Sequence, residues 1–132
     1  MITVRGYNFS REFLGERVPQ HIQNLVIRDY CKNNDLEYLL HATEYGMREC
    51  FLIFNQLLEE LNQVDGIITY SMFQLPINNK QREVIFSKII NQKKSIHFAV
   101  EKMKVSNKEE LQRVENIWNV KKISPYCLNK VI

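Results

Sequence analysis

The sequence predicts a single α/β domain in three layers, with a four-stranded, mostly parallel sheet and a C-terminal helix. Short apolar runs alternate with amphipathic stretches of helical period, and this alternation is typical of parallel strands joined by right-handed helical crossovers. The chain has 132 residues, of which 45% are hydrophobic, so one packed domain is expected rather than two. We assign residues 1–105 to the sheet core and residues 106–132 to the C-terminal helix and tail.

Two strands and two helices are expected in the first half of the chain. The first strand covers residues 2–7, and Pro19 favours the first turn of the next helix, where its missing N–H costs nothing. The second strand covers residues 36–40, and residues 41–47 are expected to form a loop. Helical spacing predicts the apolar faces of the two helices: Ile22, Leu25, Val26 and Tyr30 in the first, and Phe51, Phe54, Leu57, Leu58 and Leu61 in the second.

The third strand and third helix are expected next. The strand covers residues 67–70, and Pro76 prevents its continuation because a central strand excludes proline. Asn78 or Asn79 is expected to cap the helix. Its apolar residues are Val84, Ile85, Ile89 and Ile90.

The fourth strand, at residues 95–100, is followed by the last predicted helix. Ser106 and Glu109 have the spacing of a capping box, which marks a helix start. We expect the helix to end before an irregular tail from Ile123, with Pro125 as a breaker. Its apolar face is predicted to be Leu111, Val114, Ile117 and Trp118.

The charge pattern argues against a polyanionic partner. The formal net charge is +3, which is too small to indicate nucleic acid or an anionic membrane. Nucleic acid is therefore expected not to be a partner. Ten of the eleven lysines lie at or after Lys80, whereas five of the seven arginines lie in the first 48 residues.

Several classes of site are not indicated. The three cysteines, Cys31, Cys50 and Cys127, lack zinc-binding spacing, and they fit a reduced cytoplasmic location. No signal-peptide pattern or membrane-spanning run is present. The sequence also lacks a dinucleotide-binding glycine motif and a Walker A loop, so neither a cofactor nor a metal is predicted.

A candidate site follows from where the parallel strands end. Ligands of open α/β sheets bind outside the carboxyl ends of the strands. Arg11 and Arg17 precede the first helix, whose N-terminus favours anions, so an anion pocket is predicted there. The alternative is a solvated loop in which these arginines pair with Glu12 and Glu16.

Three residues at this edge have side chains suited to catalysis. Ser10 can serve as a nucleophile if a base activates it, or it can simply hydrogen-bond a ligand. Glu44 and Glu101 can move protons at a sugar, although a glutamate after a strand also caps the next helix. The predicted catalytic residues are Ser10, Glu44 and Glu101, and the predicted ligand-binding residues are Arg5, Tyr7, Arg11, Arg17, Gln20, His21, Asn24, Tyr45, Ser71 and Gln74.

The three histidines give weaker signals. His97 lies in an apolar strand and is expected to be a hydrogen-bonded core residue. His41 and Glu44 are three residues apart and would need further ligands to hold a metal.

Long segments of the chain resemble the sporadic carbohydrate cluster protein family. They include Arg5–Tyr7, Arg17–Cys31, Ala42–Tyr45, Asp65–Ile67 and His97–Glu101. That family is encoded among bacterial genes for surface polysaccharide, and its reaction is open. The resemblance implies a protein of surface-glycan biosynthesis. Together with the predicted anion pocket, it leads us to expect binding or modification of an anionic or nucleotide-linked sugar. His41 departs from the pattern, where serine is expected.

A second, more distant resemblance concerns the serine recombinase catalytic domain. The resemblance rests on Gly6-Tyr7, Ser10, a first helix that contains glutamines, and Asp65–Ile68. It implies a flavodoxin-like or resolvase-like sheet with Ser10 at the position of the nucleophile. Recombinase chemistry also needs arginines after the third strand, where this chain has Gln74-Leu75-Pro76.

Three functions are therefore open. The first is the sugar-binding or sugar-modifying protein of a glycan pathway, with a sugar phosphate or sugar nucleotide as ligand. The second is a non-enzymatic, homo-oligomeric accessory protein of such a pathway. The third is a degenerate recombinase-like protein that binds nucleic acid.

Overall fold

The computed structural model describes residues 2–9, 18–44, 51–76 and 78–131, and it contains a five-stranded sheet of order β2-β1-β3-β4-β5. The first four strands are parallel and β5 is antiparallel to β4. The strands are β1 (Ile2–Phe9), β2 (Leu36–Glu44), β3 (Gly66–Thr69), β4 (Ser95–Phe98) and β5 (Met103–Val105). The helices are α1 (Gln20–Asn33), α2 (Leu52–Glu59), α3 (Asn79–Asn91) and α4 (Lys108–Val131), with short 3-10 turns η1 (Leu61–Gln63) and η2 (Met72–Gln74).

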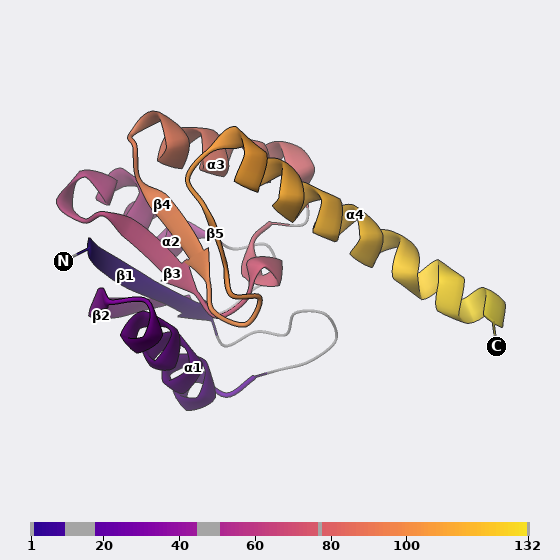
Figure 1. Ribbon diagram of the computed structural model, residues 1–132, viewed down its shortest axis with the longest axis horizontal. Helices are drawn as coiled ribbons and strands as arrows, with labels where there is room; N and C mark the ends of the chain where they lie inside the picture. Colours follow the sequence, from indigo (N-terminus) through magenta and orange to yellow (C-terminus); the bar gives the residue numbers. More distant parts are fainter. Residues whose placement is uncertain (1, 10–17, 45–50, 77, 132) are drawn as a thin grey trace.

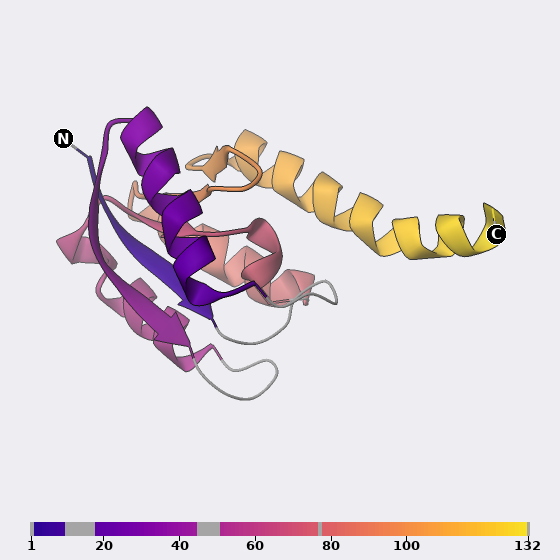
Figure 2. The ribbon, with the colours of Figure 1, turned by 90° about the horizontal axis from the view of Figure 1, so that it is seen from below.

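The predicted α/β class with a mostly parallel sheet is confirmed, but the sheet has a fifth strand that the sequence did not predict. α1 covers one face of the sheet, whereas α2 and α3 cover the other (Figures 1 and 2). β5 is only three residues long and follows β4 through a turn at Glu101 and Lys102. So short an edge strand leaves no visible alternation in the sequence.

Two apolar clusters fill the layers between helices and sheet. The larger one includes Ile67, Phe86 and Trp118 and lies on the α2 and α3 side. The smaller one includes Ile27 and Ile68 and lies beneath α1. Ile67 and Ile68 are neighbours in β3 and enter different clusters, because successive strand residues point to opposite faces.

The predicted apolar face of α1 is partly wrong. Gln23, Ile27 and Cys31 are buried, whereas Ile22 is 37% exposed and Leu25 is 62% exposed. The buried stripe repeats every fourth residue and begins with a glutamine. A pattern search for apolar residues misses it, because a buried amide is stable when it is hydrogen-bonded.

Two strands extend further than predicted. β1 continues to Phe9 and β2 continues to Glu44, so the expected loop at residues 41–47 is wrong for its first four positions. The two strands pair in register up to Phe9 and Glu44, with an irregularity between Arg5 and Tyr7. Parallel pairing with a neighbour stabilises polar residues in a strand that their propensity alone would not place there.

The start of α4 is displaced by one residue from the predicted capping box. Asn107 accepts a hydrogen bond from the Glu110 amide at 2.9 Å, and Glu110 accepts from the backbone and hydroxyl of Ser106 at 2.9 and 2.7 Å. Asn107 therefore caps the helix in place of Ser106, and the Glu110 carboxylate reaches back to Ser106, the residue before the cap. Asparagine is at least as good a cap as serine, so the sequence allowed both alternatives.

The predicted irregular tail is also wrong, because α4 runs through Pro125 to Val131. Proline removes one backbone hydrogen bond but keeps a helical φ, so a helix can continue past it. The distal half of α4 projects beyond the sheet and its covering helices (Figure 1).

One ion pair anchors the base of α4 to α3. Nε and Nη2 of Arg82 donate to the two carboxylate oxygens of Glu115 at 3.0 and 2.8 Å. Nη1 donates to the carbonyl of Pro76 at 2.9 Å, and the guanidinium lies 4.0 Å from the centre of the Trp118 ring. Arg82 is only 1% exposed, so its charge is neutralised by Glu115 inside the protein.

Candidate functional site

The carboxyl ends of the four parallel strands meet at one edge of the sheet. Phe9 pairs with Glu44 at the ends of β1 and β2, and Thr69 pairs with Phe98 at the ends of β3 and β4. The segments after β3 and β4 therefore start at the same edge, which we call the rim. The predicted residues Ser71, Gln74 and Glu101 lie in these segments.

Glu101 and Ser71 connect the two segments at the rim. The Ser71 hydroxyl and the Met72 amide donate to separate oxygens of Glu101, both at 2.8 Å. Ser71 Oγ also accepts from the Phe73 amide at 3.2 Å and so caps η2. Both oxygens of this carboxylate hold the turn after β3, and the proton-transfer role expected for Glu101 stays a prediction.

A pair of buried amides joins the rim to α1. Nε2 of Gln74 donates to Oε1 of Gln23 at 2.8 Å, and Nε2 of Gln23 donates to the carbonyl of Val18 at 2.8 Å. The two glutamines are 1% and 0% exposed. Gln74 Oε1 also accepts from the Ser71 amide at 3.2 Å. These hydrogen bonds fix the segment that enters α1 against the turn after β3.

A second polar cluster connects β1, β2 and α1. Asn8 donates to Asn24 at 3.1 Å, Thr43 donates to Asn8 at 2.8 Å, and the Tyr38 hydroxyl donates to Asn24 at 3.3 Å. Asn8 is fully buried. Buried side-chain amides that are hydrogen-bonded to one another are held in fixed orientations. This cluster therefore fixes β1 and β2 against α1 beside the rim.

The sequence pattern indicated some of these residues and not others. Asn24 was predicted, whereas the structural roles of Asn8, Gln23, Tyr38 and Thr43 were not. A usable signal was the spacing of Gln23 from Ile27 and Cys31, which puts a glutamine on the buried stripe of α1.

Two predicted ligand-binding residues lie away from the rim. Arg5 forms an ion pair with Glu60, which ends α2. Tyr7 is fully buried and packs edge-to-face on Phe54, with ring centres 4.9 Å apart. Both side chains therefore connect β1 to α2 and its C-terminal end.

The remaining predicted site residues lie at the start of α1, at the end of β2 or outside the described residues. Gln20 and His21 begin α1, where Gln20 is half-buried and His21 is exposed. The backbone of Glu44 ends β2 beside Phe9. Ser10, Arg11, Arg17 and Tyr45 lie outside the described residues.

His97 is the buried, hydrogen-bonded histidine that the sequence predicts. Nδ1 lies 3.0 Å from the Tyr30 hydroxyl and Nε2 lies 3.0 Å from the Ser95 hydroxyl. Burial lowers the pKa of His97 to about 4, with Lys104 adding to the effect and Glu110 opposing it. Burial also raises the pKa of Tyr30. The imidazole is therefore neutral at physiological pH.

Over the described ranges, no three His, Cys, Asp or Glu side chains converge as a metal site would require. Nor does any helix in these ranges have the length and apolarity to cross a bilayer.

Comparison with known proteins gives similarity at the level of structure. No protein-family model matches the chain, and no curated protein matches it in sequence. The crystal structure of the N-terminal catalytic domain of TP901-1 integrase matches with a TM-score of 0.60 and 11% identity, over 93% of this chain and 98% of that one. The chain has the resolvase-type catalytic-domain fold.

A second match has the same resolvase-type fold. It is the crystal structure of a resolvase family site-specific recombinase from Streptococcus pneumoniae, with a TM-score of 0.63 and 10% identity. The match covers 96% of this chain and 93% of that one. The recombinase resemblance stated from Gly6-Tyr7 and Asp65–Ile68 is thus confirmed for the fold.

These findings correct two sequence predictions. Carbohydrate biosynthesis has no support among the comparisons, which find recombination enzymes and no family model for a carbohydrate cluster protein. The expectation of a sugar partner with nucleic acid excluded is also overturned by the resolvase-type fold. The exclusion of nucleic acid rested on the net charge of +3, and a total charge conceals how the charges are distributed.

Proposed function

We propose that the chain binds DNA through its resolvase-type fold and does not itself break DNA strands. The observation that carries this proposal is the fold match, because it covers 93% and 96% of the chain and nearly all of two domains named as integrase and recombinase. A fold by itself does not fix function, so the proposal also draws on the charge distribution and on the side chains at the rim.

The distribution of charge supports the same partner. Residues 80–132 contain twelve Lys or Arg and five Asp or Glu, a formal charge of +7, whereas residues 1–79 contain six and ten, a charge of −4. A basic segment of this kind attracts a polyanion even when the whole chain is nearly neutral.

The rim after β3 supports binding without strand cleavage. Phosphoryl transfer needs cations placed where charge develops on the transferred phosphate. Residues 71–76 contain no arginine, and Gln74 is buried in its bond to Gln23. Two arginines elsewhere are engaged in ion pairs, Arg5 with Glu60 and Arg82 with Glu115.

The test measures binding and cleavage separately. Fluorescence anisotropy with a labelled 30-base-pair duplex is expected to give a Kd of about 1–100 μM at physiological salt, the range of sequence-independent binding. Incubation with supercoiled plasmid is expected to give neither nicked circles nor a covalent protein–DNA adduct.

Two results would count against the proposal. Absence of binding at 50 mM salt would remove DNA as the partner. An adduct that the wild type forms and Ser10→Ala does not would show that the chain cleaves DNA with Ser10 as nucleophile. Glu101→Gln serves as a matched variant at the rim, since it changes the carboxylate without touching Ser10.

A further inference from the structure

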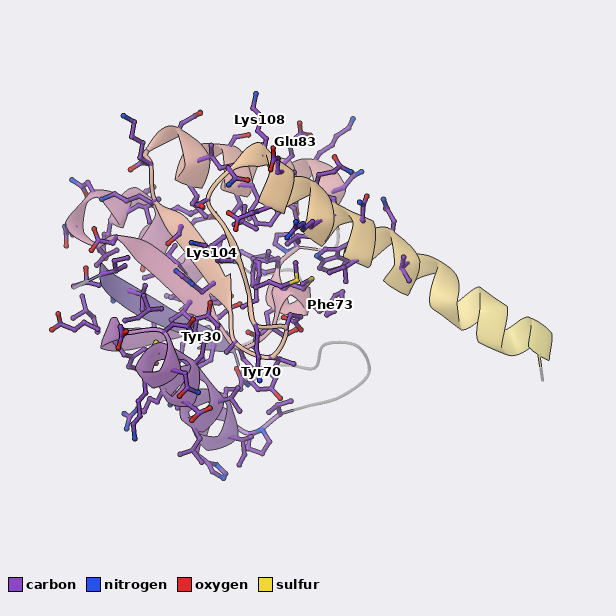
Figure 3. The ribbon with its side chains drawn as sticks, viewed as in Figure 1. Tyr30, Tyr70, Phe73, Glu83, Lys104 and Lys108 are labelled. Carbon is purple, nitrogen blue, oxygen red and sulfur yellow. The ribbon has the colours of Figure 1, made fainter. Side chains whose placement is uncertain are left out.

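Three cations gather beside the rim on the edge of the sheet. Lys102, Lys104 and Arg113 are exposed and line a shallow hollow of about 190 Å³ between β5 and the first turns of α4, together with Met103 and Glu110. Lys104 pairs with His97 of β4, and Figure 3 shows it over the sheet. We call Lys102, Lys104 and Arg113 the edge cations.

The one acid lining this hollow, Glu110, has one carboxylate oxygen engaged within the protein. Glu110 accepts two hydrogen bonds from Ser106 through a single oxygen, at 2.9 and 2.7 Å, and completes the cap of α4. The ion pairs found among the described residues are Arg5 with Glu60 and Arg82 with Glu115. Within the described part of the chain, then, no acidic side chain forms an ion pair with an edge cation.

The backbone of Lys102 has an unusual, left-handed conformation. Its φ is 54°, in the left-handed region where glycine or asparagine is favoured and other residues cost about 1 kcal/mol or more. A lysine is retained at this strained turn directly after Glu101, whose carboxylate holds the rim. Lys104 is two residues further on, in the middle of β5, so the turn and the strand each contribute one lysine to the hollow.

We propose that the edge cations bind the phosphodiester backbone of DNA without reading its sequence. This inference rests on the proposed function and adds a contact surface made of residues other than the predicted nucleophile Ser10. Three cations spread over a strand and a helix, around an open hollow, suit successive phosphates better than one small anion. Lysine ammonium groups on flexible stems contact phosphates without selecting a base.

Salt dependence gives a quantitative test. Each phosphate contact contributes about 0.9 to the slope of log K against log salt. The triple variant Lys102→Gln/Lys104→Gln/Arg113→Gln is expected to reduce the magnitude of the slope by about 2.7 and to weaken binding about eightfold for each cation at 0.1 M salt. Two duplexes of unrelated sequence are expected to give the same loss. The measurement is anisotropy from 50 to 300 mM KCl.

A matched control removes three exposed lysines from the opposite end of the sheet. Lys32 and Lys88 lie in the last turns of α1 and α3, and Lys93 lies in the turn before β4. Lys32→Gln/Lys88→Gln/Lys93→Gln changes the net charge by the same amount and is expected to change the slope by less than about 0.9, one contact. Far-ultraviolet circular dichroism checks that both triple variants are folded.

The outcomes separate this inference from the proposed function. A slope lost in the edge variant and kept in the control supports the inference. If the wild type binds and the two triple variants have equal slopes, the edge surface is wrong and DNA binding stands. If the wild type does not bind at 50 mM salt, both fail. Should the triple variant not fold, Lys104→Gln alone must lower the slope by about 0.9, and an unchanged slope overturns the inference.

Discussion

The Oε2 atom of Glu101 lies 2.8 Å from the hydroxyl of Ser71, although the two residues are 30 positions apart in the chain. This contact, with the one from the Met72 amide to Oε1, ties the turn after β3 to the turn after β4. The carboxylate of Glu101 thus holds these two turns of the rim together. A charge-assisted bond of this kind is stronger than a neutral one.

Loss of the Glu101 carboxylate is expected to destabilise the rim. Glu101→Ala should lower the free energy of unfolding by about 1–2 kcal/mol, because two hydrogen bonds to a half-buried carboxylate are lost. Glu101→Gln keeps one carbonyl acceptor and should cost less. Urea denaturation measures both, with Glu83→Ala on the exposed side of α3 as control. A value for Glu101→Ala equal to that of the control would contradict the role of this carboxylate.

The amide pair of Gln23 and Gln74 is expected to behave as one unit. Gln74→Leu leaves Oε1 of Gln23 without the donor that lies 2.8 Å away, and an unsatisfied buried acceptor costs about 1–3 kcal/mol. The double variant Gln23→Leu/Gln74→Leu removes both polar groups, so its loss should be smaller than the sum of the single losses by at least about 1 kcal/mol. Additive losses in urea denaturation would show that the two amides are independent.

The ion pair of Arg82 and Glu115 gives a larger expected effect. Arg82→Met leaves Glu115 beside an apolar partner and should lower stability by about 3–5 kcal/mol, the cost of breaking a buried pair from one side. Arg82→Met/Glu115→Leu should recover much of that loss. Thermal unfolding followed by the fluorescence of Trp118, which contacts Arg82, measures the attachment of α4. A double variant less stable than Arg82→Met would contradict this account.

A helix or strand could be predicted from the sequence when its apolar residues formed a clear pattern. β3 and β4 were found because each has buried apolar residues within a short run between turn signals. Asn78 caps α3 with bonds to the amides of Lys80 and Gln81, as its position before the helix indicated. β5 was missed because three residues at an edge show no period. The end of α4 was missed because an interior proline costs a hydrogen bond and crowds the carbonyl four residues earlier, yet α4 continues past Pro125.

The site was harder to predict because the same polar side chain can either be buried in a hydrogen bond or face solvent. Parallel strands put Ser71, Gln74 and Glu101 at one rim, as the strand order implied. Sequence alone does not reveal that Gln74 turns inward to Gln23, since a glutamine has the same pattern whether it is buried or solvated. Arg5 at mid-strand was assigned to a ligand, yet its partner is Glu60, 55 residues away.

The buried imidazole of His97 predicts a loss of stability in mild acid. Its pKa is about 4 in the folded protein and about 6.5 when unfolded, so the unfolded chain binds the proton first. Stability should be constant above pH 6.5 and fall as the pH drops to 4, by a total of about 3 kcal/mol. His97→Gln should flatten this part of the curve. Urea midpoints between pH 4 and 8 measure it, and equal slopes in wild type and His97→Gln would refute the assignment.

Lys93 and Lys102 provide a matched pair because both have a positive φ, 60° and 54° respectively. Glycine accepts this conformation without steric cost, so Lys93→Gly and Lys102→Gly should each raise the free energy of unfolding by about 0.5–1 kcal/mol. Each also removes one positive charge. Only Lys102 belongs to the edge cations, so only Lys102→Gly should weaken DNA binding, by about eightfold at 0.1 M salt. Urea denaturation and anisotropy on the same samples measure both effects. Equal losses of affinity would show that net charge, rather than the edge surface, attracts the DNA.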